Sequence, residues 1–408
     1  MLELLNPEKT AVSHLRPYGT CREIELVITA ARCVLGTCDQ ETLEACLGQE
    51  LRWDAVLRIA EWHKLDAILF RALRSCSNAA VPVEYLDQLE EQFRLHSFRA
   101  LNLSSALASI MTTFQEAGIA FLQVKGLTLA QMIHEELACR PALDLDLVVH
   151  PDQLDLALRV LEEHHGYGFS DPNNARQREF QRKLDYEVSL CGAGVTLDLH
   201  WSLSRYQAMF PFNLEKALRH PYLVPIGHIE VPTLAPTDLI PYLAFHGSRH
   251  LWMKLFWILD LAAWIQRHPH LDWQGVVARA EDLRQQRSLA HGILLAERIF
   301  GTAVPAPVAA LAAQDHALNG LVEKALAFLF TREHHMVPYE IEVNQREKLR
   351  WGAYMQTRWL GKLAVTTRYI THPGRADVLA FPLPRPLFPL YRLVRPLRLL
   401  KRSLLPKT

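Results

Sequence analysis

Apolar residues recur at helical spacing through the first quarter of the chain. From Glu23 to Phe114 they return every third or fourth position, for example between Trp53 and Trp62. Runs that alternate with a period of two, which are typical of strands, are almost absent from this segment. The pattern therefore predicts a helical domain over residues 1–114.

The pattern then changes to short strand-like runs separated by helical spacing. Four runs carry the strand pattern: 119–124, 144–149, 186–191 and 195–201. Helical spacing fills the interval between the first two runs and returns after the second. The last two runs are joined by Gly192-Ala-Gly194, which favours a hairpin. Together these elements predict a compact α/β core with a small mixed sheet over residues 115–215.

Helical spacing dominates again from Thr237 onward. Thr237 and Asp238 are suited to cap a long helix that runs towards Trp264. Further helical runs follow, which predicts a C-terminal helical domain over residues 216–376. The fold class expected from the whole pattern is α+β, a small mixed sheet flanked by N- and C-terminal helical domains.

The last segment, residues 377–408, is a Pro-rich, basic tail. No acidic residue follows Asp377, whereas seven basic residues do: Arg385, Arg392, Arg395, Arg398, Lys401, Arg402 and Lys407. Such a tail suits a peripheral contact with an anionic membrane surface, or a phosphate-rich acceptor. The interpretation that we favour is plainer. The apolar side chains of the tail, Tyr391, Leu393, Leu397 and Leu400, pack on the protein body while the basic groups stay in water.

Composition narrows the class of protein. Half of the 408 residues are hydrophobic and 22% are charged, with 44 basic and 44 acidic side chains, as in a folded soluble protein. A net charge near zero argues against a chain that coats nucleic acid along its length. Seven cysteines without CxxC spacing, and an N-terminus without an apolar leader, predict reduced thiols and a cytoplasmic protein.

The most apolar window, residues 255–265, is too short for a membrane span. It also contains an acid, Asp260. A buried carboxylate needs a partner, and Arg249 or Lys254 are the candidates that lie near in sequence. Asp260 is therefore expected to be structural rather than catalytic.

Three aspartates are expected to meet on the predicted sheet. Strand alternation puts Asp144 and Asp146 on one face of their run, about 7 Å apart at Cα. It also puts Asp198 and His200 on one face of theirs, and Asp198 joins the pair if the two strands are neighbours. Carboxylates this close repel one another, so they need a divalent cation, and hard oxygen ligands favour Mg²⁺ or Mn²⁺. Taken alone, an Asp-x-Asp strand is more often a solvated face.

A phosphate-binding turn is expected directly after the first strand. Lys125 and Gly126 join that strand to a helix, whose N-terminus presents free backbone amides and a positive dipole end. Gly126 lets the backbone approach a phosphate closely, while Lys125 and Arg140 can pair with its oxygens. The alternative is a plain connection, with Arg140 on the surface.

A histidine pair lies on the predicted helix that follows Thr237. His246 and His250 are four positions apart and so share a helix face. Gly247 stands where the zinc-peptidase motif needs glutamate, which excludes that activity. Two interpretations stay equal: with Lys254 these histidines contact nucleotide or acceptor, or they pack as ordinary helix residues at a domain boundary.

In this order the motifs resemble the uncharacterised bacterial nucleotidyltransferase family of the DNA polymerase β-like superfamily. The likeness rests on the Lys-Gly turn, the Asp-x-Asp strand and the later Leu-Asp-Leu-His-Trp strand, and it extends to the histidine helix and the Pro-rich ending. It implies that Gly126 takes the turn position, Asp144 and Asp146 the metal pair, and Asp198 the third acid.

The chain departs from the superfamily at the turn. The serine that usually contacts phosphate is absent, so that contact falls to backbone amides, to Thr128 or to Lys125. This departure affects the details of triphosphate binding more than the metal site.

The resemblance implies a metal-dependent nucleotidyltransferase that uses an NTP and Mg²⁺ or Mn²⁺. Two such ions can bridge a triphosphate and activate an attacking hydroxyl. The acceptor stays open among a peptide, a small molecule and RNA, and the neutral charge gives RNA no support. The rival hypothesis is a catalytically silent nucleotide-binding or scaffold protein with the same fold, against which the retention of all three acids argues.

Overall fold

The computed structural model describes residues 12–76, 81–134, 136–170, 182, 185–192, 194–330, 345–357 and 359–404. This part is mainly helical and contains one five-stranded and one two-stranded sheet, which confirms the predicted α+β class. The chain divides into two compact units built from segments distant in sequence. The first comprises Met1–Ser105, Lys125–Leu143 and Tyr222–Val343, and the second Ala106–Val124, Asp144–Pro221 and Asn344–Thr408.

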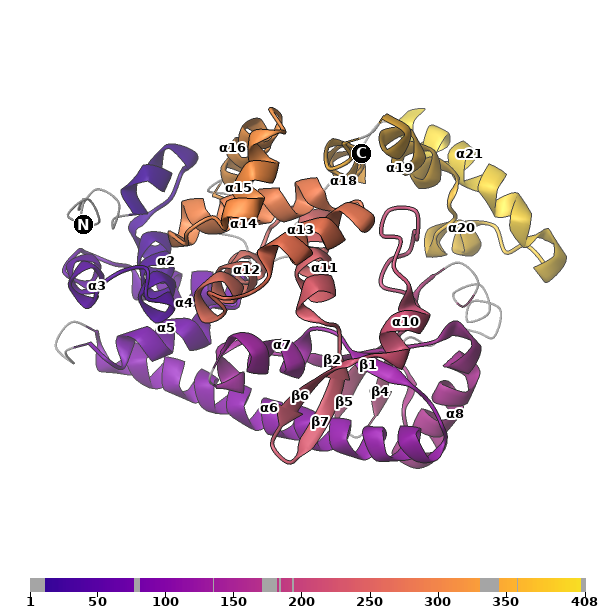
Figure 1. The fold of residues 1–408 in the computed structure, drawn as a ribbon, viewed down its shortest axis with the longest axis horizontal. Helices are drawn as coiled ribbons and strands as arrows, with labels where there is room; N and C mark the ends of the chain where they lie inside the picture. The colour runs from indigo at the N-terminus through magenta and orange to yellow at the C-terminus, as the bar shows by residue number, and fades with distance from the viewer. Residues whose placement is uncertain are drawn as a thin grey trace. The chain divides into compact units, whose positions relative to one another are not determined.

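The first unit consists of helices and one hairpin (Figure 1). Its elements are η1 (Val12–Tyr18), α2 (Arg22–Leu35), α3 (Gln40–Leu47), α4 (Trp53–His63), α5 (Asp66–Leu73), most of α6 (Val83–Glu116), α7 (Gly126–Ile133), η2 (Leu137–Cys139), β6 (Tyr222–Ile226), β7 (Ile229–Thr233), α11 (Pro236–Arg249), α12 (Leu255–Arg267), α13 (Trp273–Asp282), α14 (Gln286–Phe300), α15 (Ala306–Ala313) and α16 (Leu318–Leu329). Large aromatic side chains, among them Trp252, Trp264 and Phe300, are fully buried in its core. None of the described helices combines the length and the apolarity that crossing a bilayer requires.

The long helix predicted from Thr237 to Trp264 is wrong, because the structure has two helices, α11 and α12, in its place. Trp252 turns back in the left-handed region, at a φ of 55°, and its backbone N–H donates to the carbonyl of Gly247. Its buried ring packs so closely on Gly247 that a Cβ there would lie 2.2 Å from a ring carbon. The predicted cap is wrong too, since α11 begins after Ala235 without a side-chain cap.

The second unit contains a mixed sheet with the strand order β1-β2-β5-β4-β3. Its strands are β1 (Phe121–Gln123), β2 (Asp144–Val149), β3 (Gly168–Phe169), β4 (Glu187–Gly192) and β5 (Val195–His200). Strands β2 and β5 pair in parallel and the other neighbours are antiparallel, which includes the predicted hairpin of β4 and β5. The helical elements of this unit are the end of α6 from Ala106 onward, η3 (Pro151–Gln153), α8 (Leu154–His165), α10 (Leu214–Arg219), α18 (Gln345–Tyr354), α19 (Trp359–Thr371), α20 (Arg375–Ala380), η4 (Arg385–Leu390) and α21 (Tyr391–Leu404).

The two faces of this sheet differ in polarity, as the alternation of its strands predicts. On one face the side chains of Leu147, Leu199 and Leu190 are buried, and Phe114 of α6 packs edge-on against Phe121 of β1. The other face carries the polar residues of β2, β5 and β4: Asp144, Asp146, Thr196, Asp198, His200, Glu187 and Ser189. The apolar face thus belongs to the core, and the polar face carries the candidate site residues Asp144, Asp146 and Asp198.

The tail is held by one buried acid. Asp377 is fully buried and pairs with Arg395 at 3.1 Å and with Arg398 at 2.5 Å. Tyr391 is buried as well, and its hydroxyl donates to the carbonyl of Phe381 at 2.7 Å. These contacts turn one face of α21 towards α20 and the residues directly after it.

The interpretation of the tail that we favoured from the sequence is wrong for three of its four apolar residues. Tyr391 packs inward, but Leu393, Leu397 and Leu400 are 63%, 66% and 57% exposed. The reason lies in the helix period, since residues two positions apart point about 200° apart around a helix. Because Asp377 draws the arginine face inward, the leucine face points outward.

Candidate metal centre

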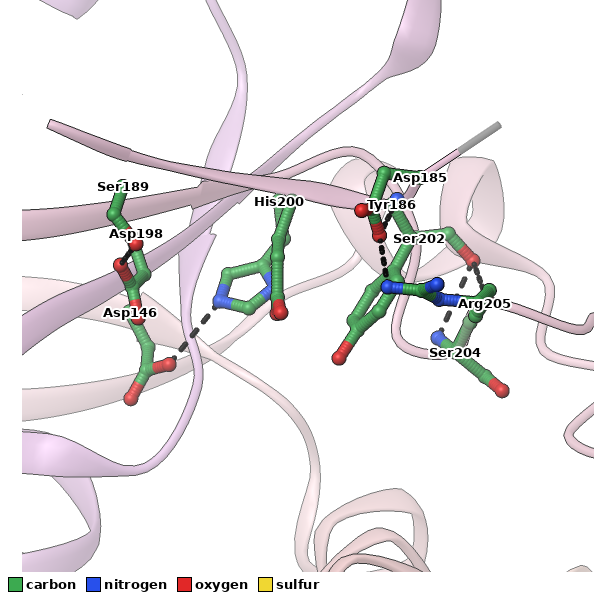
Figure 2. A network of polar contacts seen from close by, with 10 residues as sticks. Asp146, Asp185, Tyr186, Ser189, Asp198, His200, Ser202, Ser204 and Arg205 are labelled. Carbon is green, nitrogen blue, oxygen red and sulfur yellow. Dashed lines mark hydrogen bonds and ion pairs between the residues drawn. The ribbon is translucent and has the colours of Figure 1, made fainter. Parts of the chain in front are cut away.

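Three side chains from two neighbouring strands converge on the polar face of the sheet. Asp146 of β2 and Asp198 of β5 are direct partners in the parallel register, and His200 follows on the same face. One ligand atom from each of these residues lies within 4.8 Å of the others. Figure 2 shows Asp146 between Asp198 and the His200 ring. The expected meeting of Asp146 with Asp198 is therefore what the strand pairing produces.

His200 sits between two carboxylates. Its Nε2 lies 3.1 Å from Oδ1 of Asp146, and its Nδ1 lies 3.1 Å from Oε2 of Glu187. Burial alone would lower the pKa of His200, but the hydrogen bonds and charges of the two carboxylates outweigh it and raise the pKa to about 9. As an imidazolium, His200 balances the charge of the acids around it.

Asp198 is half-buried and accepts a hydrogen bond from Ser189. The Ser189 Oγ lies 2.5 Å from Oδ1 of Asp198, across the β4–β5 hairpin (Figure 2). Burial raises the pKa of Asp198 above the ordinary value, the Ser189 hydrogen bond opposes this shift, and the charge of Asp146 adds to it. The two aspartates therefore repel one another, and a cation relieves that repulsion.

Asp144 lies one step further along the same face of β2. Its register partner is Thr196 rather than an acid, and its side chain is half-buried. It is not one of the three residues whose ligand atoms lie within 4.8 Å of one another. Among the described residues, the cluster thus consists of Asp146, Asp198 and His200, and Asp144 lies beside it on the same strand.

Two residues of this site were missed in the sequence argument, Ser189 and Glu187. Both lie on β4, in register with Asp198 and His200 respectively. A signal was available, because the short Gly-Ala-Gly connection fixes the register of the hairpin. Counting back from that turn places Ser189 opposite Asp198 and Glu187 opposite His200.

The Lys-Gly turn has an unusual backbone. Lys125 has a φ of 66° and a ψ of −145°, and Gly126, the first residue of α7, has a φ of 52°. The Lys125 conformation belongs to a region that is normally restricted to glycine, and it costs about 1–3 kcal/mol. Thr128 is buried and its hydroxyl donates to the Lys125 carbonyl at 3.0 Å. Strain of this kind is typical of functional turns.

Arg140 is buried and supports this turn from within the first unit. Its guanidinium pairs with both carboxylate oxygens of Asp260, at 2.8 and 3.0 Å, and Nη1 lies 3.5 Å from the carbonyl of Gly126. The candidates proposed as partners of Asp260, Arg249 and Lys254, are therefore wrong. The expectation that Asp260 needs a partner is met by a residue 120 positions away.

The histidine pair forms an aromatic cluster in the first unit. The rings of His246 and His250 lie 4.7 Å apart, so the predicted shared face is confirmed, and both rings contact Trp257. Burial, together with the nearby charge of Lys125, lowers the pKa of His246 well below the ordinary value. Lys254 donates to the Trp62 carbonyl and lies over that indole ring, and burial lowers its pKa to about 8.

A comparison with protein families assigns the chain to a family. A family model described as "Uncharacterised nucleotidyltransferase" matches residues 49–301, well over half of the chain. The matched segment contains the strained turn, the three converging side chains and the histidine cluster. A search of the curated proteins found no match.

Proposed function

Because this chain belongs to the uncharacterised nucleotidyltransferase family, and is thus a transferase, we propose that it transfers a nucleoside monophosphate from an NTP to an acceptor hydroxyl or phosphate. Pyrophosphate leaves as the acceptor oxygen bonds to the α-phosphorus and the bond from that phosphorus to the bridging oxygen breaks. The observation that carries the proposal is the convergence of Asp146, Asp198 and His200 on one face of the sheet.

The donor set fits a divalent cation. Asp146 and Asp198 offer hard carboxylate oxygens, and Asp144 extends the acidic face by one step of the strand. Oxygen donors of this kind suit Mg²⁺ or Mn²⁺ better than softer metals. When bound, such ions neutralise the phosphate charge that develops during phosphoryl transfer. We assign the metal contacts to Asp144, Asp146 and Asp198.

The protein's own groups have separate tasks in this proposal. Asp198, whose carboxylate is oriented by Ser189, takes the proton of the acceptor hydroxyl. His200 holds Asp146 in position through its hydrogen bond. The backbone of the Lys125–Gly126 turn and the Lys125 side chain bind phosphate, since a helix N-terminus favours anions.

Other predicted contacts have support for a positioning role. The hydroxyl of Thr128 and the guanidinium of Arg140 both contact the backbone of the turn, so we assign them to holding its shape. For His246, His250 and Lys254, the tilted ring contacts and the contact with Trp62 support the packing interpretation over direct contact with nucleotide or acceptor.

The decisive measurement is pyrophosphate release by the full-length protein with Mg²⁺ or Mn²⁺ and each NTP, in the presence of cell extract as a source of acceptors. Mass spectrometry identifies which molecule gains a nucleotide, and so separates peptide, small-molecule and RNA acceptors. The Asp144→Asn/Asp146→Asn variant is expected to lose this activity while keeping its circular dichroism spectrum. Asp152→Asn is the matched control, because Asp152 lies on η3 of the same unit and its side chain is 89% exposed.

The rival function is a nucleotide-binding or scaffold protein without catalysis. Calorimetry with Mg²⁺ and each NTP separates it from the enzyme. Binding without pyrophosphate release under every acceptor condition supports the scaffold, and full turnover by the Asp144→Asn/Asp146→Asn variant removes the proposed site.

A further inference from the structure

The C-terminal helices carry an unusual share of the exposed apolar side chains. Ten of the eighteen exposed large hydrophobic residues in the described part of the chain lie between positions 359 and 400. They are Trp359, Leu363, Ile370, Leu379, Phe381, Leu387, Leu390, Leu393, Leu397 and Leu400, and we refer to them as the tail surface. Among them, Leu393, Leu397 and Leu400 share one face of α21, and an exposed apolar stripe of this kind is a candidate binding surface.

Helix α21 is yellow in Figure 1, and contacts on one face of it hold the leucines of the opposite face in their exposed position. Arg395 and Arg398 both pair with Asp377, which is fully buried. Rotating the leucines inward would leave that carboxylate without its partners, which costs several kcal/mol. The exposed stripe is therefore fixed by the fold.

Charge decides what kind of partner suits this surface. Arg392 and Lys401 are exposed beside the leucines of α21, and no acidic residue follows Asp377 in the sequence. A helix with leucines on its outer face, cations at its flanks and no acids is the pattern of interfacial membrane helices. A different exposed stripe on α6, formed by Leu95, Phe98 and Leu101, lacks this pattern, because Glu90 and Glu91 lie one turn before it.

We propose that the tail surface docks on an anionic phospholipid bilayer, with α21 lying in the plane of the interface. Its 14 residues form a helix about 21 Å long, whose leucines enter the acyl boundary while Arg392 and Lys401 contact lipid phosphates. The proposal is independent of the nucleotidyl transfer proposed above. It would place the transferase at a membrane surface.

Vesicle flotation with the full-length protein tests this inference. Binding to phosphatidylcholine vesicles that contain phosphatidylserine is expected, together with much weaker binding to phosphatidylcholine alone. Raising the salt from about 0.1 M to about 0.5 M shortens the screening length and is expected to release the protein partly. Equal binding to both vesicle types, or no binding to either, overturns the proposal.

The variants separate the apolar from the charged contribution. Leu393→Gln/Leu397→Gln/Leu400→Gln is expected to weaken binding by at least about tenfold, because the buried apolar area supplies the affinity. Arg392→Gln/Lys401→Gln is expected to weaken binding to anionic vesicles by about fivefold for each charge removed. The second variant leaves the apolar stripe intact, so it keeps the test valid if the leucine variant misfolds.

The matched control is Leu95→Gln/Phe98→Gln/Leu101→Gln, which changes the same number of exposed apolar residues on α6. Its binding is expected to equal that of the wild type, and an equal loss in this control contradicts the assignment. Light scattering adds a second criterion. If the wild type is an oligomer that the leucine variant disperses, the tail surface is an interface between copies of the chain, and the lipid proposal fails.

Discussion

The pair formed by Arg140 and Asp260 gives the sharpest test of how the strained turn is supported. Their side chains are 8% and 3% exposed, and two hydrogen bonds of 2.8 and 3.0 Å join them. Replacing Asp260 with leucine leaves a guanidinium buried without its counterion. From measured cases of this kind we expect a loss of about 3–5 kcal/mol in the free energy of unfolding.

The double variant Arg140→Met/Asp260→Leu is expected to recover most of this loss. It removes both charges together and fills the space with apolar groups, which is often neutral or stabilising in other buried pairs. The contact of Arg140 with the Gly126 carbonyl is lost as well, which costs about 1 kcal/mol. We therefore expect the double variant to lie within about 2 kcal/mol of the wild type.

Urea unfolding followed by tryptophan fluorescence measures these energies, since Trp252 and Trp264 are fully buried in the same unit. Glu90→Gln is the control, because it breaks an exposed ion pair with Arg94 and should change the energy by less than about 0.5 kcal/mol. If the double variant loses as much stability as the single variants Arg140→Met and Asp260→Leu added together, the two residues are not coupled and the reasoning fails.

Three further predictions concern backbone, packing and pH. Gly247→Ala should lower the unfolding free energy by about 1–3 kcal/mol, because the added Cβ would clash with the Trp252 ring. Gly320→Ala is the control and should not lower this energy, because a Cβ at that helix position has no neighbour within 4 Å. Thermal melts compare the two variants. Lys125→Gly should raise the unfolding free energy by about 1 kcal/mol, because glycine relieves the backbone strain at this position. The same variant should weaken NTP binding in calorimetry, and unchanged binding would exclude the phosphate-binding role of Lys125. Burial lowers the pKa of His291 to about 4, so between about pH 6.5 and pH 4 the unfolded chain binds more protons than the folded one. The free energy of unfolding therefore falls as the pH drops through this range, by about 3 kcal/mol in total. His291→Leu should remove this part of the pH dependence, which urea titrations at several pH values measure.

The sequence predicted those features that depend on the local repeat of apolar and polar residues. The alternation of β2 and β5 was enough to put Asp146, Asp198 and His200 on one face, and the parallel pairing then brought them together. The sequence could not predict the partner of Asp260, because Arg140 is 120 positions away and no periodic pattern links the two. For the same reason it could not show which face of α21 turns inward.

The candidate site forms only if its strands pair in the correct register. A slip of β5 by one position along β2 would put a leucine beside Asp146 in place of Asp198 and would turn Asp198 to the apolar face. The β4–β5 hairpin opposes such a slip, because it pairs Ser189 with Asp198 and Glu187 with His200. The short hairpin connection thus supports the geometry of the candidate site: it keeps Ser189 in contact with Asp198 and Glu187 in contact with His200.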